Sequence, residues 1–499
     1  MMRKFLFVGL LAGRAADTSP LMRVADGETW SYADVVGLSG RLAHQLQALG
    51  VQAGDRVAVQ VDKSVEAIAL YLATIRAGAV FLPLNTAYTR AEVGYFLQDA
   101  EPCVFVCSSK RAGEFEGIEA RLTTLDGDGG GSLMQAAQAH PAAFDDIARG
   151  PQDLAAILYT SGTTGLSKGA MLSHDNLLSN SKTLVDYWQF TADDVLLHAL
   201  PIFHTHGLFV ATNVAMIAGA SMIFLSRFNL DQMIEHLTNA TALMGVPTFY
   251  TRLLADDRFD RDLVAHMRLF VSGSAPMLAE THVEFEERTG HRILERYGMT
   301  ETNMNTSNPY VGERRAGSVG FPLPGVEIRI ADPETGAALP AGEIGMIEIR
   351  GPNVFLGYWR KPEKTALELR DDGFFISGDL GKFDDDGYLH ILGRDKDLII
   401  SGGYNIYPKQ IETEIDALEG VLESAVFGIA HADLGEAVAA AVVPIDGAEL
   451  DGEQLIKALE PVLARFKLPR EVFIIDELPR NAMGKVQKNS LRERYARTD

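Results

Sequence analysis

The sequence is poor in cysteine, in positive charge and in long apolar stretches, and each lack excludes a class of protein. Two cysteines, Cys103 and Cys107, cannot form a disulfide framework and are too few to complete a zinc site. A formal net charge of -22 argues against nonspecific binding to nucleic acid or to anionic membranes. No run of about 18 apolar residues occurs, so we expect no membrane-spanning helix. With 47% hydrophobic and 22% charged residues, the composition is typical of a soluble globular protein, which we expect to be cytoplasmic.

Residues 1–16 allow two interpretations. Arg3 and Lys4 precede the apolar run FLFVGLLAG, as basic residues do in a short signal peptide. The sequence that follows, GRAAD, is a poor match to a cleavage site. We therefore predict an amphipathic first helix, and a targeting segment stays open as the alternative.

The chain is too long for one hydrophobic core, and the pattern of predicted strands, helices and turns changes along its length. From residue 30 to about 273, strand-like runs alternate with helix-like repeats, which is typical of a largely parallel sheet covered by helices. From about 316, turn signals become dense and the strands short. The sequence thus predicts an α/β fold: a large N-terminal domain of helix-covered, mostly parallel sheets, a small β-rich subdomain at about 316–393, and a small α+β C-terminal domain.

The segment YTSGTTGLSKG (159–169) combines glycines, hydroxyls and one lysine directly after the apolar run LAAIL. Glycines let backbone N–H groups approach an anion closely, and the hydroxyls and the ammonium add donors, so the segment suits a polyphosphate. It is not a Walker A loop, because its glycine spacing differs and Gly169 stands where a Ser or Thr would hold magnesium.

Seven ordered blocks, spanning nearly the whole chain, resemble the adenylate-forming superfamily of acyl-CoA synthetases, adenylation domains and firefly luciferase. The blocks are YTSGTTGLSKG (159–169), ALPIFHTHGLF (199–209), VSGSAPM (271–277), ERYGMTET (295–302), GFFISGDLG (373–381), GRDKDLIISGGYNIYPKQIE (393–412) and LPRNAMGKVQK (478–488). The resemblance implies two half-reactions. A carboxylate and ATP first give an acyl-adenylate and pyrophosphate, and the thiol of coenzyme A then attacks the acyl-adenylate.

The resemblance also implies the nucleotide site. Tyr297 would stack on adenine, and the small residues of VSGSAPM would let the flat base lie against backbone. Asp379 and Arg394 would bind the ribose. The residues so implied for ATP are Thr160, Ser161, Gly162, Thr163, Thr164, Gly165, Ser167, Lys168, Gly273, Ser274, Ala275, Pro276, Arg296, Tyr297, Gly298, Met299, Asp379 and Arg394.

Catalysis is assigned by the same resemblance. Glu301, with Thr164, would hold Mg²⁺, because a hard cation that bridges phosphate oxygens prefers carboxylate and hydroxyl oxygens. Thr300 would donate to the α-phosphate. Lys485 matches the catalytic lysine, which neutralises charge as the carboxylate attacks phosphorus.

Between the two half-reactions, the C-terminal domain of the resembling enzymes is mobile. The implied division is an N-terminal domain 1–393, a hinge 394–397 that pivots at Lys396, and a C-terminal domain 398–499. Gly402 and Gly403 would then line the pantetheine tunnel of coenzyme A. Some family members are switched off when the lysine that matches Lys485 is acetylated, which makes a lysine acetyltransferase and a deacetylase candidate partners.

The acid substrate is suggested by GVPTFYTRLL (245–254), in which Thr248 and Arg252 share one helix face. An arginine would pair the second carboxylate of a dicarboxylic acid. Together with ERYGMTETNMNTSNPY, this segment looks like bacterial malonyl-CoA synthetases of the MatB type, whose matching arginine binds that carboxylate. Malonate, or methylmalonate, is the predicted substrate. The other implied acid-site residues are His206, Ser272, Met304 and the channel residue His204.

Other functions stay open at this point. The chain could load a carrier protein instead of coenzyme A, or use a short fatty or aryl acid. An NTPase or kinase would release ADP rather than AMP, and a nonenzymatic ATP-binding protein would be expected to lack Lys485 or Glu301, which are both present.

Overall fold

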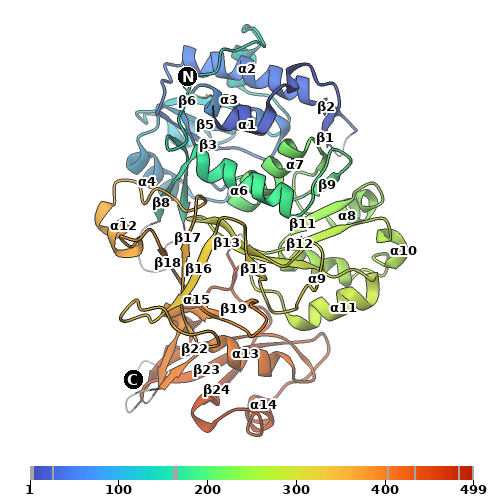
Figure 1. The fold of residues 1–499 in the computed structure, drawn as a ribbon, viewed down its shortest axis with the longest axis vertical. Helices are drawn as coiled ribbons and strands as arrows, with labels where there is room; N and C mark the ends of the chain where they lie inside the picture. The colour runs from blue at the N-terminus through green and yellow to red at the C-terminus, as the bar shows by residue number, and fades with distance from the viewer. Residues whose placement is uncertain are drawn as a thin grey trace. The chain divides into compact units, whose positions relative to one another are not determined.

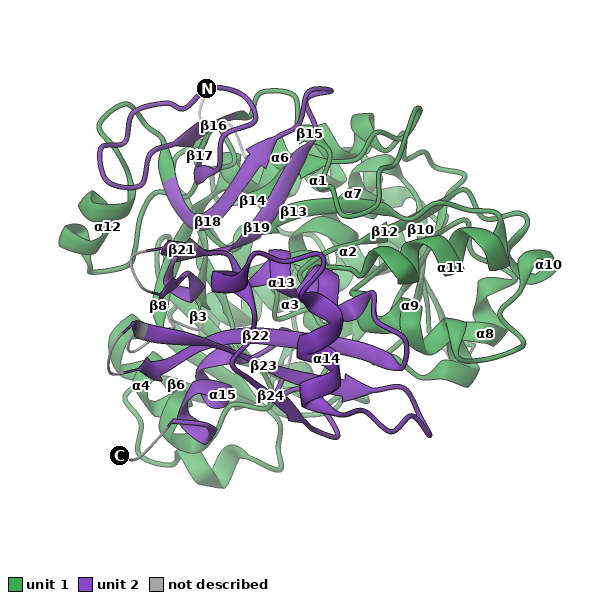
Figure 2. Cartoon of the chain, turned by 90° about the horizontal axis from the view of Figure 1, so that it is seen from below, with its two compact units in different colours: residues 1–327, 349–375 green, residues 328–348, 376–499 purple. Residues whose placement is uncertain are grey.

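The structure is a computed structural model that describes residues 5–24, 27–160, 167–401, 404–431, 434–481 and 484–496 (Figure 1). By their internal contacts the described residues form two compact units (Figure 2). The first consists of residues 1–327 and 349–375, and the second of residues 328–348 and 376–499.

One sheet of the first unit is six-stranded and parallel except at β7 and β8. Its inner strands are short apolar runs, as expected for strands covered on both faces. In spatial order the strands are β6 (Arg121–Thr124), β5 (Val104–Cys107), β3 (Arg56–Gln60), β4 (Val80–Pro83), β7 (Leu154–Thr160) and β8 (Lys168–Ser173).

The other sheet of the first unit has nine strands among the described residues. Its central strands are parallel, and antiparallel strands close both edges. In spatial order they are β15 (Phe321–Pro322), β14 (Asn303–Ser307), β13 (Leu294–Met299), β12 (Leu269–Ser272), β11 (Ala242–Gly245), β9 (Val195–His198), β10 (Ser221–Phe224), β1 (Pro20–Val24) and β2 (Thr29–Ser31).

Helices pack on these sheets, and α6 contacts strands of both, namely β7, β8 and β14. Three helices start with reciprocal side-chain and backbone caps, which satisfy N–H groups that a helix leaves unpaired. The helices of this unit are α1 (Leu6–Leu11), α2 (Tyr32–Ala48), α3 (Val65–Arg76), α4 (Arg90–Ala100), α5 (Ser132–Ala137), α6 (His174–Tyr187), α7 (Asn213–Ala218), α8 (Leu230–Leu237), α9 (Pro247–Leu254), α10 (Arg261–Val264), α11 (Ala279–Thr289) and α12 (Pro362–Glu368).

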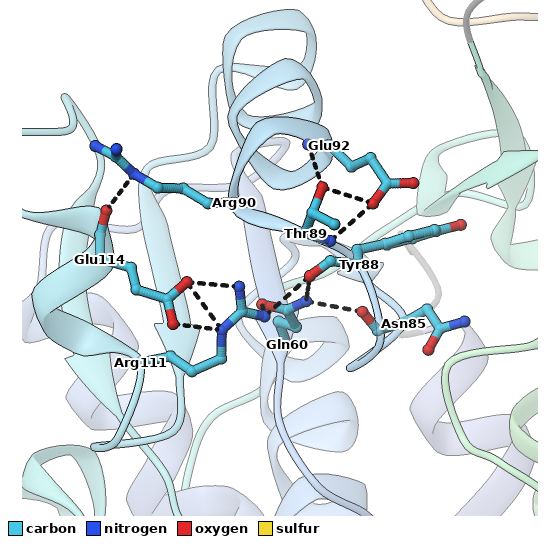
Figure 3. Close-up of polar contacts among 8 residues, drawn as sticks. All are labelled: Gln60, Asn85, Tyr88, Thr89, Arg90, Glu92, Arg111 and Glu114. Atoms are coloured by element: carbon cyan, nitrogen blue, oxygen red, sulfur yellow. Dashed lines mark hydrogen bonds and ion pairs between the residues drawn. The ribbon is translucent and has the colours of Figure 1, made fainter.

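A polar cluster fixes the end of β3 (Figure 3). The Arg111 Nη1 donates to Gln60 Oε1 at 2.7 Å and to the Tyr88 carbonyl at 3.1 Å, and Nη2 donates to Glu114 Oε2 at 2.7 Å. The Gln60 amide in turn donates to the Asn85 carbonyl at 2.8 Å. We call Gln60, Asn85, Tyr88, Arg111 and Glu114 the β3 cluster.

The second unit is rich in β-strands, most of them antiparallel. One sheet contains β16 (Glu327–Ala331), β17 (Gly345–Arg350), β18 (Phe375–Phe383) and β19 (Leu389–Arg394). A few residues at the ends of its strands are counted with the first unit. The other contains β21 (Tyr404–Ile406), β20 (Ile399–Ser401), β23 (Gly435–Pro444), β22 (Val421–His431) and β24 (Glu471–Ile474). Its helices are α13 (Pro408–Asp416), α14 (Gly452–Leu459) and α15 (Lys488–Arg494).

The predicted α/β fold class is confirmed, including the parallel sheets and the α+β C-terminal part. Near the N-terminus, the predicted helix is present as α1, which buries Leu6, Leu10 and Leu11. No helix in the described part of the chain has the length and apolar character needed to cross a membrane. The predicted domain limits stay predictions; residues 394–397 lie inside the second compact unit.

Candidate functional site

The predicted phosphate loop joins two antiparallel strands. Thr160 ends β7, Lys168 begins β8, and the two residues are paired in register. Just before Lys168, the Ser167 carbonyl accepts from the Tyr95 hydroxyl at 2.8 Å. The described residues on either side of positions 161–166 are therefore fixed in place. Five predicted residues lie outside the described residues: Ser161, Gly162, Thr163, Thr164 and Gly165.

Lys168 lies against an acidic cluster that the sequence did not reveal. Its ammonium is 3.3 Å from Glu368 Oε1 and 4.2 Å above the ring of Tyr358. Glu368 also pairs with Lys364 at 2.8 Å. The Tyr358 hydroxyl lies 2.5 Å from Glu368 Oε2 and 3.0 Å from Glu301 Oε1. Burial, reinforced by both carboxylates, raises the pKa of Tyr358 and keeps its proton in place.

The surroundings of Glu301 fit a divalent cation. Glu301 is buried, and its Oε1 accepts from the Tyr358 hydroxyl at 3.0 Å. A carboxylate oxygen is the kind of ligand that a hard divalent cation prefers. Among the described residues no group of three His, Cys, Asp or Glu side chains could hold a metal ion alone. A cation here would thus need oxygens from a bound ligand as well, as Mg²⁺ takes them from phosphates.

The predicted adenine-binding turn lies where β13 passes into β14. Tyr297 and Met299 lie in the second half of β13, which ends at Met299. Tyr297 is 8% exposed. A Cβ at Gly298 would lie 2.0 Å from the Asn303 carbonyl oxygen, so only glycine fits there. Thr300 follows in the turn that leads to Glu301 and is partly exposed.

A second set of predicted residues is buried around the guanidinium of Arg296. Arg296 is 3% exposed, and its Nε and Nη2 have no hydrogen-bond partner among the described residues. Ser272 Oγ and His206 Nε2 are likewise buried without a described partner. Ser274 Oγ is 3.3 Å from His206 Nδ1, and a Cβ at Gly273 would lie 2.5 Å from the guanidinium carbon of Arg296. We call Arg296, Ser272 and His206 the basic pocket.

Burial sets the protonation of the pocket. It lowers the pKa of Arg296 to about 9, against a smaller opposing effect of Tyr250, so the guanidinium remains charged at neutral pH. Burial, and then the charge of Arg296, hold the pKa of His206 well below its usual range. Ser274 has φ = 73° although it is not a glycine, a strained conformation that is most often found at functional sites.

His206 begins a π-helix, His206–Thr212, a rare conformation that is frequent at functional sites. A Cβ at Gly207 would lie 2.0 Å from the Pro201 carbonyl oxygen, which explains the glycine after His206. His204 precedes this helix, and its carbonyl accepts from the Leu208 N–H at 3.0 Å. Met304 is buried, and its backbone is fixed by Asn180 at both the N–H and the carbonyl.

Arg252 is exposed on α9, and its guanidinium carbon lies 5.6 Å from the ring centre of Phe228. Its predicted role in binding the second carboxylate stays a prediction. The predicted helix is present and begins at Pro247. Helical spacing alone cannot tell which face of a short helix is covered, so the exposure of Arg252 could not be predicted from the sequence.

The second unit holds the other predicted residues. Asp379 and Arg394 are paired across β18 and β19, with Arg394 Nε 2.7 Å from Asp379 Oδ1. Partial loss of surrounding water lowers the pKa of Lys396 to about 8; Asp397 opposes this, and Arg394 and Lys485 add to it.

Lys485 is exposed in a turn after Gly484, where its N–H donates to Asn481 Oδ1 at 3.0 Å. A charged group at the surface of such a turn is accessible to a ligand or to a modifying enzyme. The predicted pantetheine residues Gly402 and Gly403 lie outside the described residues.

Known protein families match both parts of the chain. A profile of the AMP-binding enzyme family matches residues 12–359, and a profile of the AMP-binding enzyme C-terminal domain matches residues 410–485. The chain belongs to the AMP-binding enzyme family. This family includes the adenylate-forming enzymes that the seven sequence blocks resemble.

Individual relatives are similar over nearly the whole chain. The structure of ATP-bound MatB from Rhodopseudomonas palustris is 60% identical, with a TM-score of 0.97, and the match covers 99% of each chain. A malonate–CoA ligase of Arabidopsis thaliana is 33% identical and covers 94% of this chain and 85% of that protein. A feruloyl-CoA synthase of an Amycolatopsis species is 35% identical and covers 94% of each. Family membership alone therefore leaves the acid substrate to be argued from the site.

Proposed function

We propose that this chain is an AMP-forming malonyl-CoA synthetase, which joins malonate to coenzyme A through malonyl-adenylate and releases AMP and pyrophosphate. The observation that carries the acid is the basic pocket. A buried guanidinium with two unpaired donor atoms, beside an unpaired hydroxyl, is costly unless a ligand supplies an anion. The carboxylate of malonate that does not react would supply it, in the bidentate geometry that arginine favours.

This assignment moves the second carboxylate from Arg252 to Arg296. Arg252 is exposed, so water already solvates its charge and a bound carboxylate would gain little there. Arg296 is enclosed, so its attraction for a carboxylate is weakly screened. Ser272 and His206 supply neutral polar atoms around the same anion, and Met304 is proposed as an apolar neighbour. The names of the MatB and malonate–CoA ligase relatives support the same acid.

For the nucleotide, we propose that Lys168, Thr160 and Ser167 bind phosphate at the two ends of the loop, with Thr300 at the α-phosphate. Glu301 would hold Mg²⁺, together with Thr164. The cation would neutralise phosphate oxygens and orient the leaving pyrophosphate. The other proposed contacts are with adenine, from Tyr297 and the Gly273–Pro276 turn, and with ribose, from Asp379 and Arg394.

Lys485 is proposed to supply positive charge only while the carboxylate attacks phosphorus. Lys485→Ala should therefore abolish adenylation but retain transfer of a supplied malonyl-adenylate to coenzyme A. Equal loss of both half-reactions would contradict this role. A pivot at Lys396, pantetheine binding by Gly402 and Gly403, and control by acetylation of Lys485 are proposed on the family resemblance.

The experiment that tests the function is ATP–pyrophosphate exchange with malonate, methylmalonate, acetate, butyrate and benzoate. We expect malonate to support exchange with the highest kcat/KM, and the full reaction with coenzyme A to release AMP. Benzoate or butyrate as the preferred acid would contradict the assignment. Faster transfer to a carrier protein than to coenzyme A would contradict the second half-reaction.

A further inference from the structure

Lys63 is a buried cationic group that the reaction described above does not use. It follows β3 and directly precedes Ser64, whose hydroxyl caps α3. Its Nζ lies 2.8 Å from His198 Nδ1, 2.8 Å from the His198 carbonyl and 4.2 Å from the ring centre of Phe224. It forms no ion pair with a described carboxylate, and burial lowers its pKa well below the usual range. Burying a lysine without an acidic partner costs free energy of folding, so we expect this lysine to have a function.

The hydrogen bonds around His198 define its tautomer. His198 is 1% exposed, and its Nε2 lies 2.9 Å from the carbonyl oxygen of Gly207. A carbonyl can only accept, so Nε2 carries the proton and donates. Nδ1 is then the acceptor for Lys63. Burial, followed by the proximity of Lys63, keeps the pKa of His198 far below its usual range, which fits a neutral ring.

The hydrogen bonds of Lys63 and His198 end on the π-helix that begins at His206, a residue of the basic pocket. The Gly207 carbonyl accepts from His198 and also from Thr212 Oγ1, at 2.8 Å. Side chains thus supply donors to a carbonyl inside the widened turn, where the ordinary helical pattern is interrupted. The residue before Gly207 is His206, whose Nδ1 faces Ser274. The path therefore runs from the end of β3, through the end of β9, to a pocket residue.

Both ends of this path are fixed. The β3 cluster holds Gln60, three positions before Lys63 (Figure 3). At the other end, Gly207 packs directly on the Pro201 carbonyl, so the π-helix has little room to slide. A change at Lys63 or His198 is consequently transmitted to the position of His206 rather than absorbed by a loose segment.

We propose that Lys63 and His198 are positioning residues for the acid site: they hold the π-helix so that His206 faces the second carboxylate of the substrate. The inference rests on the proposed function of the basic pocket and adds two residues that do not touch substrate. It makes acid recognition depend on a hydrogen-bond chain that begins in the other sheet of the first unit.

The test uses the full-length enzyme and steady-state exchange kinetics. Lys63→Met keeps the apolar stem and removes the donor, and His198→Leu removes both ring nitrogens. We expect each to raise the KM for malonate about tenfold, the equivalent of one lost positioning hydrogen bond, with the KM for ATP changed less than about twofold. His198→Gln retains one acceptor and one donor and should stay within about threefold of wild type. Thr212→Val, which loses only one donor to Gly207, should raise the KM for malonate about threefold and covers the case in which a larger change prevents folding.

His174→Leu is the matched control. His174 is also 1% exposed, and both of its ring nitrogens lack a described partner, so it carries no such chain. Its KM values should equal those of wild type. The proposal is overturned if Lys63→Met and His198→Leu lower thermal stability but leave the KM for malonate unchanged, if the KM for ATP rises equally, or if His198→Gln is no better than His198→Leu.

Failure of the proposed function would look different, because the wild-type enzyme itself would then prefer another acid. The same variants are then compared on that acid. A raised KM for it supports the positioning role, and an unchanged KM contradicts it.

Discussion

The β3 cluster and the basic pocket each place an arginine near the carboxyl ends of parallel strands, but they differ in how that arginine is satisfied. Arg111 donates to Gln60, Tyr88 and Glu114, and its hydrogen bonds to Glu114 raise its pKa (Figure 3). Arg296 has no described acid beside it, and burial lowers its pKa to about 9. The first cluster has its hydrogen bonds without a ligand, whereas we propose that a bound anion completes the second.

This difference separates residues that stabilise the fold from residues that bind. A paired, partly exposed arginine contributes to folding and gains nothing from a ligand. An enclosed, unpaired arginine lowers stability in the free protein and recovers that cost when a carboxylate pairs with it. Variants that remove each charge in turn test this difference between the two clusters.

The largest expected effect is that of Arg296→Met. Without the guanidinium, the second carboxylate loses its ionic partner, and kcat/KM for malonate should fall about a thousandfold in pyrophosphate exchange. The free energy of unfolding in urea should not fall, and an increase of about 1 to 4 kcal/mol is expected because a buried unpaired charge is gone. A variant that is both inactive and clearly less stable would mean that Arg296 belongs to the fold rather than to the site.

Arg111→Met should show the opposite pattern. Its loss leaves Gln60 Oε1 and the Tyr88 carbonyl without their donor, so the free energy of unfolding should fall by about 1 to 2 kcal/mol. The kcat/KM for malonate at a temperature well below unfolding should stay within about threefold of wild type, because Lys63 keeps its own hydrogen bonds to His198. A large loss of activity in the folded variant would remove the distinction between the two clusters.

Glu368→Gln tests the acidic cluster beside Lys168, a lysine that is paired in the fold and is also proposed to bind phosphate. The amide still accepts from Tyr358, but the ion pairs with Lys168 and Lys364 are lost. Because Lys168 is then less well positioned, the KM for ATP should rise about threefold with no change in the KM for malonate. Lys364→Ala, which removes only the outer lysine, serves as the control and should leave both values unchanged.

The smallest effect is expected for Arg252→Ala. The side chain is exposed and contacts Phe228 only loosely, so kcat/KM for malonate should change by less than about twofold. A loss as large as that of Arg296→Met would return the second carboxylate to α9 and contradict the present assignment.

The fold could be predicted from the sequence because strand and helix periods were strong. The helices α2, α3 and α4 and the strands β3, β4 and β5 lie in the range, from residue 30 to about 273, for which the sequence predicted alternating strands and helices. The pairing of Asp379 with Arg394 was also within reach, since both belong to recognised sequence blocks. These features depend on local pattern.

The rest depends on burial and on distant contacts. Arg252 and Arg296 are both arginines in segments that resemble family members, and only the structure shows that Arg296 is enclosed and Arg252 is not. Tyr358 and Glu368 lie far along the chain from Lys168, and no motif marked them. Lys63 and His198 are 135 positions apart, so their bond had no signal in sequence spacing.

The central claim is that an enclosed, unpaired Arg296 selects a dicarboxylic acid. The most direct test is the ratio of kcat/KM for malonate to kcat/KM for butyrate, measured by pyrophosphate exchange in wild type and in Arg296→Met. We predict that the ratio favours malonate in wild type and falls at least about a hundredfold in the variant, while exchange with butyrate persists. An unchanged ratio in a folded, active variant would contradict the claim.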